Sequence, residues 1–132
     1  MILYADTSAL LKRVIIEPES AAIRALLAYH YAAADLVTSS SVAWLEVWRA
    51  LRRVSGGTVG ELAAQAMSGV AEHPLTPELF NSARMIGPDT LRALDALHLV
   101  SAVAVGAEAM LTYDRGLADA APALGLSVLA PG

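Results

Sequence analysis

The sequence of 132 residues contains no cysteine, a single phenylalanine and a single lysine, Lys12. The absence of cysteine excludes disulfide bonds and thiolate metal sites, and it suits the reducing cytoplasm. Charged residues make up only 17% and the formal net charge is −4, so the chain has no overall basic field of the kind that attracts nucleic acids. That exclusion is partial, because the distribution of charge matters more than its sum and bound cations would neutralise several of the acids.

Long apolar runs are also missing, although 56% of the residues are hydrophobic and the mean hydropathy is +0.53. Asp95, Ser101 and Glu108 interrupt the most apolar stretch before it reaches the roughly 18 residues that a membrane-spanning helix needs. The N-terminus has no basic segment and meets an acid at Asp6, which predicts that there is no signal peptide. We therefore expect a cytoplasmic protein with no membrane contact, whose surplus apolar surface lies in a subunit interface or against a bound partner.

Short apolar stretches alternate with longer stretches of helical periodicity along the chain. The pattern predicts strands at 2–5, 36–38, 73–75, 109–113 and 127–129, and helices at 8–16, 18–31, 42–54, 58–71, 77–87, 90–106 and 117–124. Strands that alternate with helices indicate a short parallel sheet covered by helices on both faces. We expect a single domain over residues 1–132, an α/β fold of the three-layer α/β/α sandwich type.

Four acidic residues lie where that architecture would gather them. Asp6 and Asp114 each follow a predicted strand, so both carboxylates would lie at the edge of the sheet where α/β proteins bind their ligands. Glu46 and Asp95 lie within strongly apolar helical stretches, "SVAWLEVWRALRRV" and "LRALDALHLVSAV". A charged carboxylate without a partner on a core-facing helix surface is costly, so both acids need an explanation.

Each acid taken singly also has a purely structural explanation, as a cap, as a turn residue or as half of an ion pair. The alternatives are a helix cap at Asp6, a turn at Asp114, a pair of Glu46 with Arg49 or Arg53, and a pair of Asp95 with Arg92. Taken together, the four acids converge on one region with no lysine predicted near them. Carboxylates at close range repel, so a proton or a divalent cation must neutralise them. Such an all-oxygen cluster suits Mg²⁺ or Mn²⁺ better than zinc.

Four stretches in chain order resemble the PIN domain family, and more narrowly the VapC ribonuclease toxins. They are "YADTSAL" at the N-terminus, Glu46 in its helix, "LRALDALHLVSA" around Asp95 and "LTYDRGLADAA" around Asp114. The resemblance covers nearly the whole chain, including the terminal "LGLSVLAP". It implies a PIN-like fold and a metal-dependent endoribonuclease with Asp6, Glu46, Asp95 and Asp114 as its acidic quartet. The reaction would be hydrolysis of an RNA phosphodiester by a metal-activated water, leaving a 5′-phosphate and a 3′-hydroxyl.

The resemblance also implies individual roles and partners. Asp6 and Asp95 would be the firmest ligands of Mg²⁺ or Mn²⁺, and the other two acids would complete the cation site or orient the water. Ser8 and Thr112 match hydroxyl positions of the family that would support the ligands from behind. Members of the family form homodimers, and a cognate antitoxin lays a helix across the toxin and obstructs the site.

Three basic or titratable side chains near the acids could take part in RNA binding or in the reaction, and two of them also have a structural interpretation. Arg49 and Arg115 are candidates for contact with RNA phosphates, whereas the alternative for Arg49 is a solvated helix face. His98 follows Asp95 by one helical turn and could act as a general acid, but a core histidine with one satisfied nitrogen is the commoner arrangement.

Two other classes of protein compete with the nuclease. A phosphotransferase of the haloacid dehalogenase type needs a second aspartate two residues after Asp6, where this chain has Ser8, and a lysine far later than Lys12. A non-catalytic PIN-like module that only docks a protein partner is the second alternative. The uncompensated acids speak against it, because a scaffold has no use for them.

Overall fold

A computed structural model of the chain describes residues 1–54 and 56–132. Its strands are β1 (Ile2–Ala5), β2 (Leu36–Ser40), β3 (Ala71–His73), β4 (Ala109–Leu111) and β5 (Ser127–Leu129). They form a parallel sheet in the order β3-β2-β1-β4-β5, so β1 lies at the centre between β2 and β4. The register pairs Ala5 of β1 with Leu111 of β4, and the segments that follow these two strands therefore leave the sheet side by side.

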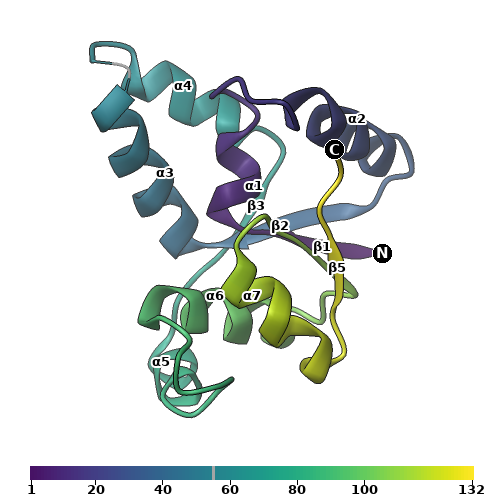
Figure 1. Cartoon of the computed structure of the whole chain (residues 1–132), viewed down its shortest axis with the longest axis vertical. Helices are drawn as coiled ribbons and strands as arrows, with labels where there is room; N and C mark the ends of the chain where they lie inside the picture. The colour runs from purple at the N-terminus through teal and green to yellow at the C-terminus, as the bar shows by residue number, and fades with distance from the viewer. Residues whose placement is uncertain (55) are drawn as a thin grey trace.

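Helices cover both faces of this sheet (Figure 1). One face carries α1 (Thr7–Leu11), α2 (Ser20–Ala32), α3 (Ser41–Val54) and α4 (Val59–Ala66). The other carries α5 (Pro77–Ala83), α6 (Ala93–Ala104), α7 (Arg115–Ala120) and the 3₁₀ helix η1 (Ala121–Leu124). The predicted three-layer α/β/α sandwich is confirmed. No helix in the described part of the chain is long and apolar enough to cross a membrane.

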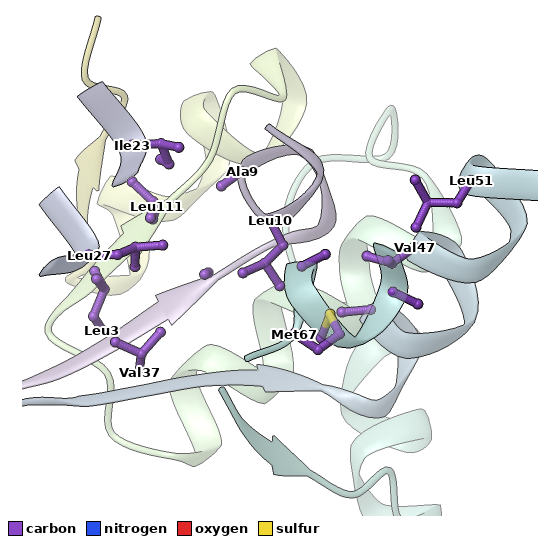
Figure 2. Packing of buried hydrophobic residues seen from close by; sticks show 14 of the residues in the cluster. Leu3, Ala9, Leu10, Ile23, Leu27, Val37, Val47, Leu51, Met67 and Leu111 are labelled. Carbon is purple, nitrogen blue, oxygen red and sulfur yellow. The ribbon is translucent and has the colours of Figure 1, made fainter. Parts of the chain in front are cut away.

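Two apolar cores hold the three layers together. Because side chains of a strand alternate between its faces, Leu3 and Ala5 of β1 join the first core while Tyr4, between them, joins the second. Figure 2 shows the first core, in which Leu10 of α1 is one of the side chains gathered between the helices and the sheet. The central strand is buried on both faces, and it is this strand that delivers Asp6 to the edge of the sheet.

Strand positions agree better with the prediction than helix ends do. The stretches 2–5 and 127–129 are strands as predicted. The strand predicted at 73–75 instead ends at His73, because Pro74 has no N–H to donate to a neighbouring strand. The strand predicted at 36–38 extends two residues further, to Ser40, and the one predicted at 109–113 ends at Leu111.

Several helices are shorter than their apolar periodicity predicts. The helix predicted at 8–16 ends at Leu11, and the next residues continue as turns in which Lys12 and Arg13 donate to the carbonyls of Ala9 and Leu10. The helix predicted from Thr90 begins at Ala93, after a turn closed by the Leu91 amide and the Pro88 carbonyl. In both cases the apolar residues still pack on the core, so the periodicity identified a buried face without marking where the helix ends.

Candidate active site at the carboxyl edge of the sheet

Asp6 follows the last residue of β1 and is 2% exposed. Its Oδ1 atom accepts hydrogen bonds from the Ala9 amide at 3.1 Å and the Ser8 hydroxyl at 2.7 Å, and its Oδ2 accepts one from Thr112 Oγ1 at 2.7 Å. Burial raises the pKa of Asp6 above its ordinary value, although His98 and these hydrogen bonds act in the opposite direction. The carboxylate is therefore both the cap of α1 and a buried acid at the sheet edge.

The hydroxyls of Ser8 and Thr112 connect Asp6 to the segment that follows β4. Each hydroxyl donates a hydrogen bond to the Asp6 carboxylate and accepts one from a backbone amide. Ser8 Oγ accepts from the Tyr113 amide at 2.9 Å, and Thr112 Oγ1 accepts from the Asp114 amide at 3.0 Å. Neither hydroxyl has rotational freedom left, because its proton and its acceptor site are both engaged. Asp6 and Asp114 are thus linked through one buried threonine.

Asp114 is the cap of α7, since its Oδ2 accepts the Leu117 amide at 2.9 Å. Gly116 leaves room for this carboxylate: a Cβ atom there would lie 3.2 Å from Asp114 Oδ2. The turn role expected for Asp114 as a structural alternative is therefore present, and it coexists with the position of the carboxylate at the sheet edge.

Glu46 reaches the same edge from α3, the helix that follows β2. Its Oε1 accepts hydrogen bonds from Thr7 Oγ1 and from His98 Nε2, both at 2.7 Å. Burial acts to raise the pKa of Glu46, but the hydrogen bonds from His98 and Thr7 outweigh it, and the pKa lies below its ordinary value. The pairing of Glu46 with Arg49 or Arg53 considered from helical spacing is absent from the described structure, because these tertiary donors hold the carboxylate.

Asp95 lies half-buried in the first turn of α6. Within residues 1–54 and 56–132, its carboxylate receives no hydrogen bond and forms no ion pair, not even with Arg92. Burial and, after it, the charge of Asp114 raise the pKa of Asp95, and Glu46 contributes in the same direction against His98 and Arg92. Asp95 is thus close enough to two other acids to be repelled by them.

The four acids share one edge of the sheet but do not form a closed cage. Across the two described segments, no three carboxylate or imidazole side chains are arranged closely enough to hold a metal ion together. Lys12 is buried, and its Nζ lies 2.8 Å from Glu17, 3.4 Å from Glu19 and over the ring of Tyr113. The single lysine is therefore already paired and does not neutralise the quartet.

The chemistry of the donor set fits a hard divalent cation. All candidate ligands are carboxylate oxygens, which Mg²⁺ and Mn²⁺ prefer and zinc does not. The raised pKa of Asp95, which burial and then Asp114 cause, means that its charge is disfavoured without a cation. A divalent ion near Asp95 would remove that repulsion.

Comparison with known proteins adds the family. The sequence matches the PIN domain family over residues 3–122. It is 34% identical to Ribonuclease VapC47 of Mycobacterium tuberculosis (strain CDC 1551 / Oshkosh), an alignment that covers 98% of this chain and 97% of the relative. Ribonuclease VapC46 of M. tuberculosis (strain ATCC 25618 / H37Rv) is likewise 34% identical, with the same coverage.

The chain is a VapC-type member of the PIN domain family. Solved structures agree with this fold. The crystal structure of VapC20 of M. tuberculosis, described as a toxin that cleaves the sarcin–ricin loop, has a TM-score of 0.73 at 18% identity, covering 89% of this chain and 94% of that one. VapBC2 of Rickettsia felis, solved with a DNA fragment from its promoter, gives the same TM-score at 14% identity, with both chains covered in full.

The structure also shows site residues that the sequence alone did not indicate. Thr7 and Tyr4 contact Glu46 and His98 directly, and both ring nitrogens of His98 are engaged instead of one. Arg49 and Arg115, the candidates for RNA contact, are both exposed. Arg49 follows Glu46 by three residues, and Arg115 follows Asp114 directly. Tyr4 and His98 are 94 positions apart, and no pattern in the sequence indicates that they are partners.

The repulsion at Asp95 predicts a gain in stability on its neutralisation. In metal-free buffer at pH 7, Asp95→Asn should be at least as stable as the parent chain, because burial and Asp114 disfavour the charged form. Because the pKa of Asp95 is raised in the folded chain, its carboxyl destabilises the fold only at pH values where it is ionised in the unfolded chain. The difference in stability between Asp95→Asn and the parent chain should therefore disappear as the pH falls below about 4. Asp6→Ala is the contrasting variant and should lose about 2 kcal/mol, because three donors lose their acceptor. Chemical denaturation measures both, and a large loss for Asp95→Asn would show that Asp95 is instead a structural hydrogen-bond partner.

Proposed function

We propose that residues 1–132 act as a single PIN-like nuclease domain, a metal-dependent endoribonuclease that is the toxin of a toxin–antitoxin pair. One observation carries the proposal: Asp6, Glu46, Asp95 and Asp114, from four separate elements, lie at one edge of the sheet in a chain whose relatives are named Ribonuclease VapC. The proposed role of this chain in RNA hydrolysis rests on that arrangement and on the chemistry of carboxylates.

Mg²⁺ or Mn²⁺ is the cofactor of this proposal. Asp6 and Asp95 are the ligands of first choice, and Glu46 and Asp114 complete the cation site. When bound, the cation would activate a water for attack on the phosphodiester and stabilise the negative charge that develops on the phosphoryl oxygen.

The residues of the chain contribute orientation and charge to this chemistry. Ser8 and Thr112 hold the Asp6 carboxylate in one orientation by donating to its two oxygens. The lowered pKa of Glu46, in which the hydrogen bonds from His98 and Thr7 outweigh burial, keeps this acid ionised near neutral pH. No described residue donates a hydrogen bond to Asp95, and burial and then Asp114 raise its pKa, so a bound cation would favour its charged form.

We propose that RNA phosphates contact Arg49 and Arg115. Arg49, Arg52 and Arg53 line a surface hollow of about 260 Å³ on α3. Arg49 follows Glu46 by three residues, so both lie on one side of the helix. None of the three arginines has an ion-pair partner among the residues that the structure describes. Arg115 follows Asp114 directly and is exposed at the start of α7.

Protein partners complete the proposal: a second copy of the chain and a cognate antitoxin. Large apolar side chains are exposed on α5, α6 and the loop between them, among them Phe80 at 50%, Met85 at 88% and Val103 at 45%. A second exposed group lies on α3, with Leu45 at 58% and Trp48 at 47%. Exposed apolar surface of this kind supports contacts with other chains.

A non-catalytic PIN-like module that binds a protein partner is the alternative function. It shares the exposed apolar side chains but gives no role to the acids. The two functions differ in one respect that a single assay measures, namely cleavage of RNA.

The first prediction of the proposal concerns that cleavage. The purified chain should cleave total cellular RNA when Mn²⁺ is supplied, and mapped products should carry 5′-phosphates and 3′-hydroxyls. Cleavage should stop in chelator and in Asp95→Asn, which should also lose the thermal stabilisation that Mn²⁺ gives the parent chain. Cleavage that persists in chelator or in Asp6→Ala would refute the proposal, and a folded chain inactive with Mn²⁺ and Mg²⁺ would favour the binding module.

The second prediction concerns the RNA path. Arg49→Gln should weaken RNA binding by the inactive Asp95→Asn chain and reduce the dependence of log Kd on log salt concentration by about one phosphate contact. Arg24→Gln is the matched control, because Arg24 is an exposed arginine on α2, a helix that carries none of the four acids. Equal effects of the two substitutions would remove Arg49 from the RNA path.

A further inference from the structure

A continuous row of hydrogen bonds runs from the backbone of β2 to the Glu46 carboxylate. The Ser40 amide donates to Tyr4 Oη at 3.0 Å. Tyr4 Oη lies 2.7 Å from His98 Nδ1, and His98 Nε2 lies 2.7 Å from Glu46 Oε1. The row joins β2, β1, α6 and α3, so it connects both faces of the sheet at the edge where the acids lie.

The middle of this row is shielded from water. Tyr4 is 0% exposed and His98 is 1% exposed, and their rings meet edge to face with centroids 5.8 Å apart. Leu99 and Met110 belong to the same apolar core as Tyr4. A buried polar group in such surroundings must find its partner within the protein, and every nitrogen and oxygen of this pair does so.

The direction of each hydrogen bond follows from the two ends of the row. The Ser40 amide can only donate, so Tyr4 Oη accepts from it. The Glu46 carboxylate can only accept, so the ring of His98 carries a proton on Nε2. In the tautomer with its proton on Nε2, Nδ1 is an acceptor, and the Tyr4 hydroxyl donates to it. His98 Nε2 therefore donates to Glu46 Oε1, which also receives the Thr7 hydroxyl.

We propose that Tyr4 and His98 are positioning residues that hold the Glu46 carboxylate in a fixed orientation. With Oε1 occupied by two donors, Oε2 is the oxygen of Glu46 that has no donor in the described structure and is left to serve the acidic edge. This inference deepens the proposed function and rests on it for the task of Glu46, whereas the hydrogen-bond row itself does not depend on it. A general-acid role for His98 does not follow, because its Nε2 proton is directed at Glu46 and the ring is buried.

Two substitutions test the row at its two inner members. Tyr4→Phe removes the donor to His98 Nδ1 and the acceptor of the Ser40 amide, and it keeps the aromatic ring in the core. His98→Gln keeps an amide N–H that can replace Nε2 but loses the ring. Tyr31→Phe is the matched control, because the Tyr31 hydroxyl donates to the Ser68 carbonyl and lies on α2, which carries none of the four acids.

Ring nitrogen ¹⁵N shifts of His98 and Mn²⁺ binding by calorimetry are the readouts. The parent chain should show the proton on Nε2, and Tyr4→Phe should mix the two tautomers while Tyr31→Phe leaves them unchanged. Tyr4→Phe should weaken Mn²⁺ binding and lower kcat for RNA by about 10-fold with KM unchanged, and His98→Gln should retain more activity than His98→Leu.

Two results would overturn the inference. One is a proton on Nδ1 of His98 in the parent chain. The other is Mn²⁺ affinity and kcat of Tyr4→Phe equal to those of Tyr31→Phe when all variants are folded. A parent chain that neither binds Mn²⁺ nor cleaves RNA would instead refute the proposed function, and the ¹⁵N shifts would still decide whether Tyr4 and His98 orient Glu46 as assigned.

Discussion

The buried carboxylate of Asp6 is the group on which the rest of the site depends. Burial of this acid at the end of the central strand is costly, as the direction of its pKa shift shows, and hydrogen bonds from Ala9, Ser8 and Thr112 offset that cost. The same bonds begin α1 and connect it to the segment after β4. The cap role of Asp6 is therefore present and compatible with the proposed role as a metal ligand, because the same contacts fix the orientation of the carboxylate.

Much of the fold was predictable because its causes are local. Alternation of short apolar strands with amphipathic helices is enough to indicate a parallel sheet with two helical layers, and Asp6 and Asp114 follow strands that pair in that sheet. The ends of helices were less predictable. At Lys12 the chain leaves α1 while its side chain reaches Glu17 and Glu19, and no pattern of apolar residues encodes that departure.

The candidate site was predictable in its acids and not in their partners. Helical spacing offered Arg49 as a partner for Glu46, but the carboxylate is held by Thr7 and His98, which lie 39 and 52 positions away in the chain. A tertiary contact overrides a local one here because the site-facing side of α3 is partly buried, where hydrogen bonds are stronger than at a solvated surface. Tyr4 and His98 are separated by 94 positions, and nothing in one sequence joins them. The family resemblance indicated the four acids in their order along the chain, but it gave no information on the hydrogen bonds that join Tyr4, His98 and Glu46.

The proposed function requires that Asp6, Asp95 and their neighbouring acids share a divalent cation at the carboxyl edge of the sheet. The most direct measurement is an anomalous difference map from crystals of the parent chain grown with Mn²⁺, recorded at the manganese absorption edge. We expect manganese density within coordinating distance of the Asp6 and Asp95 carboxylates, with Glu46 or Asp114 reaching it directly or through water. Manganese bound elsewhere on the chain, or no density at this edge when Mn²⁺ is saturating, would show that these acids do not share a cation.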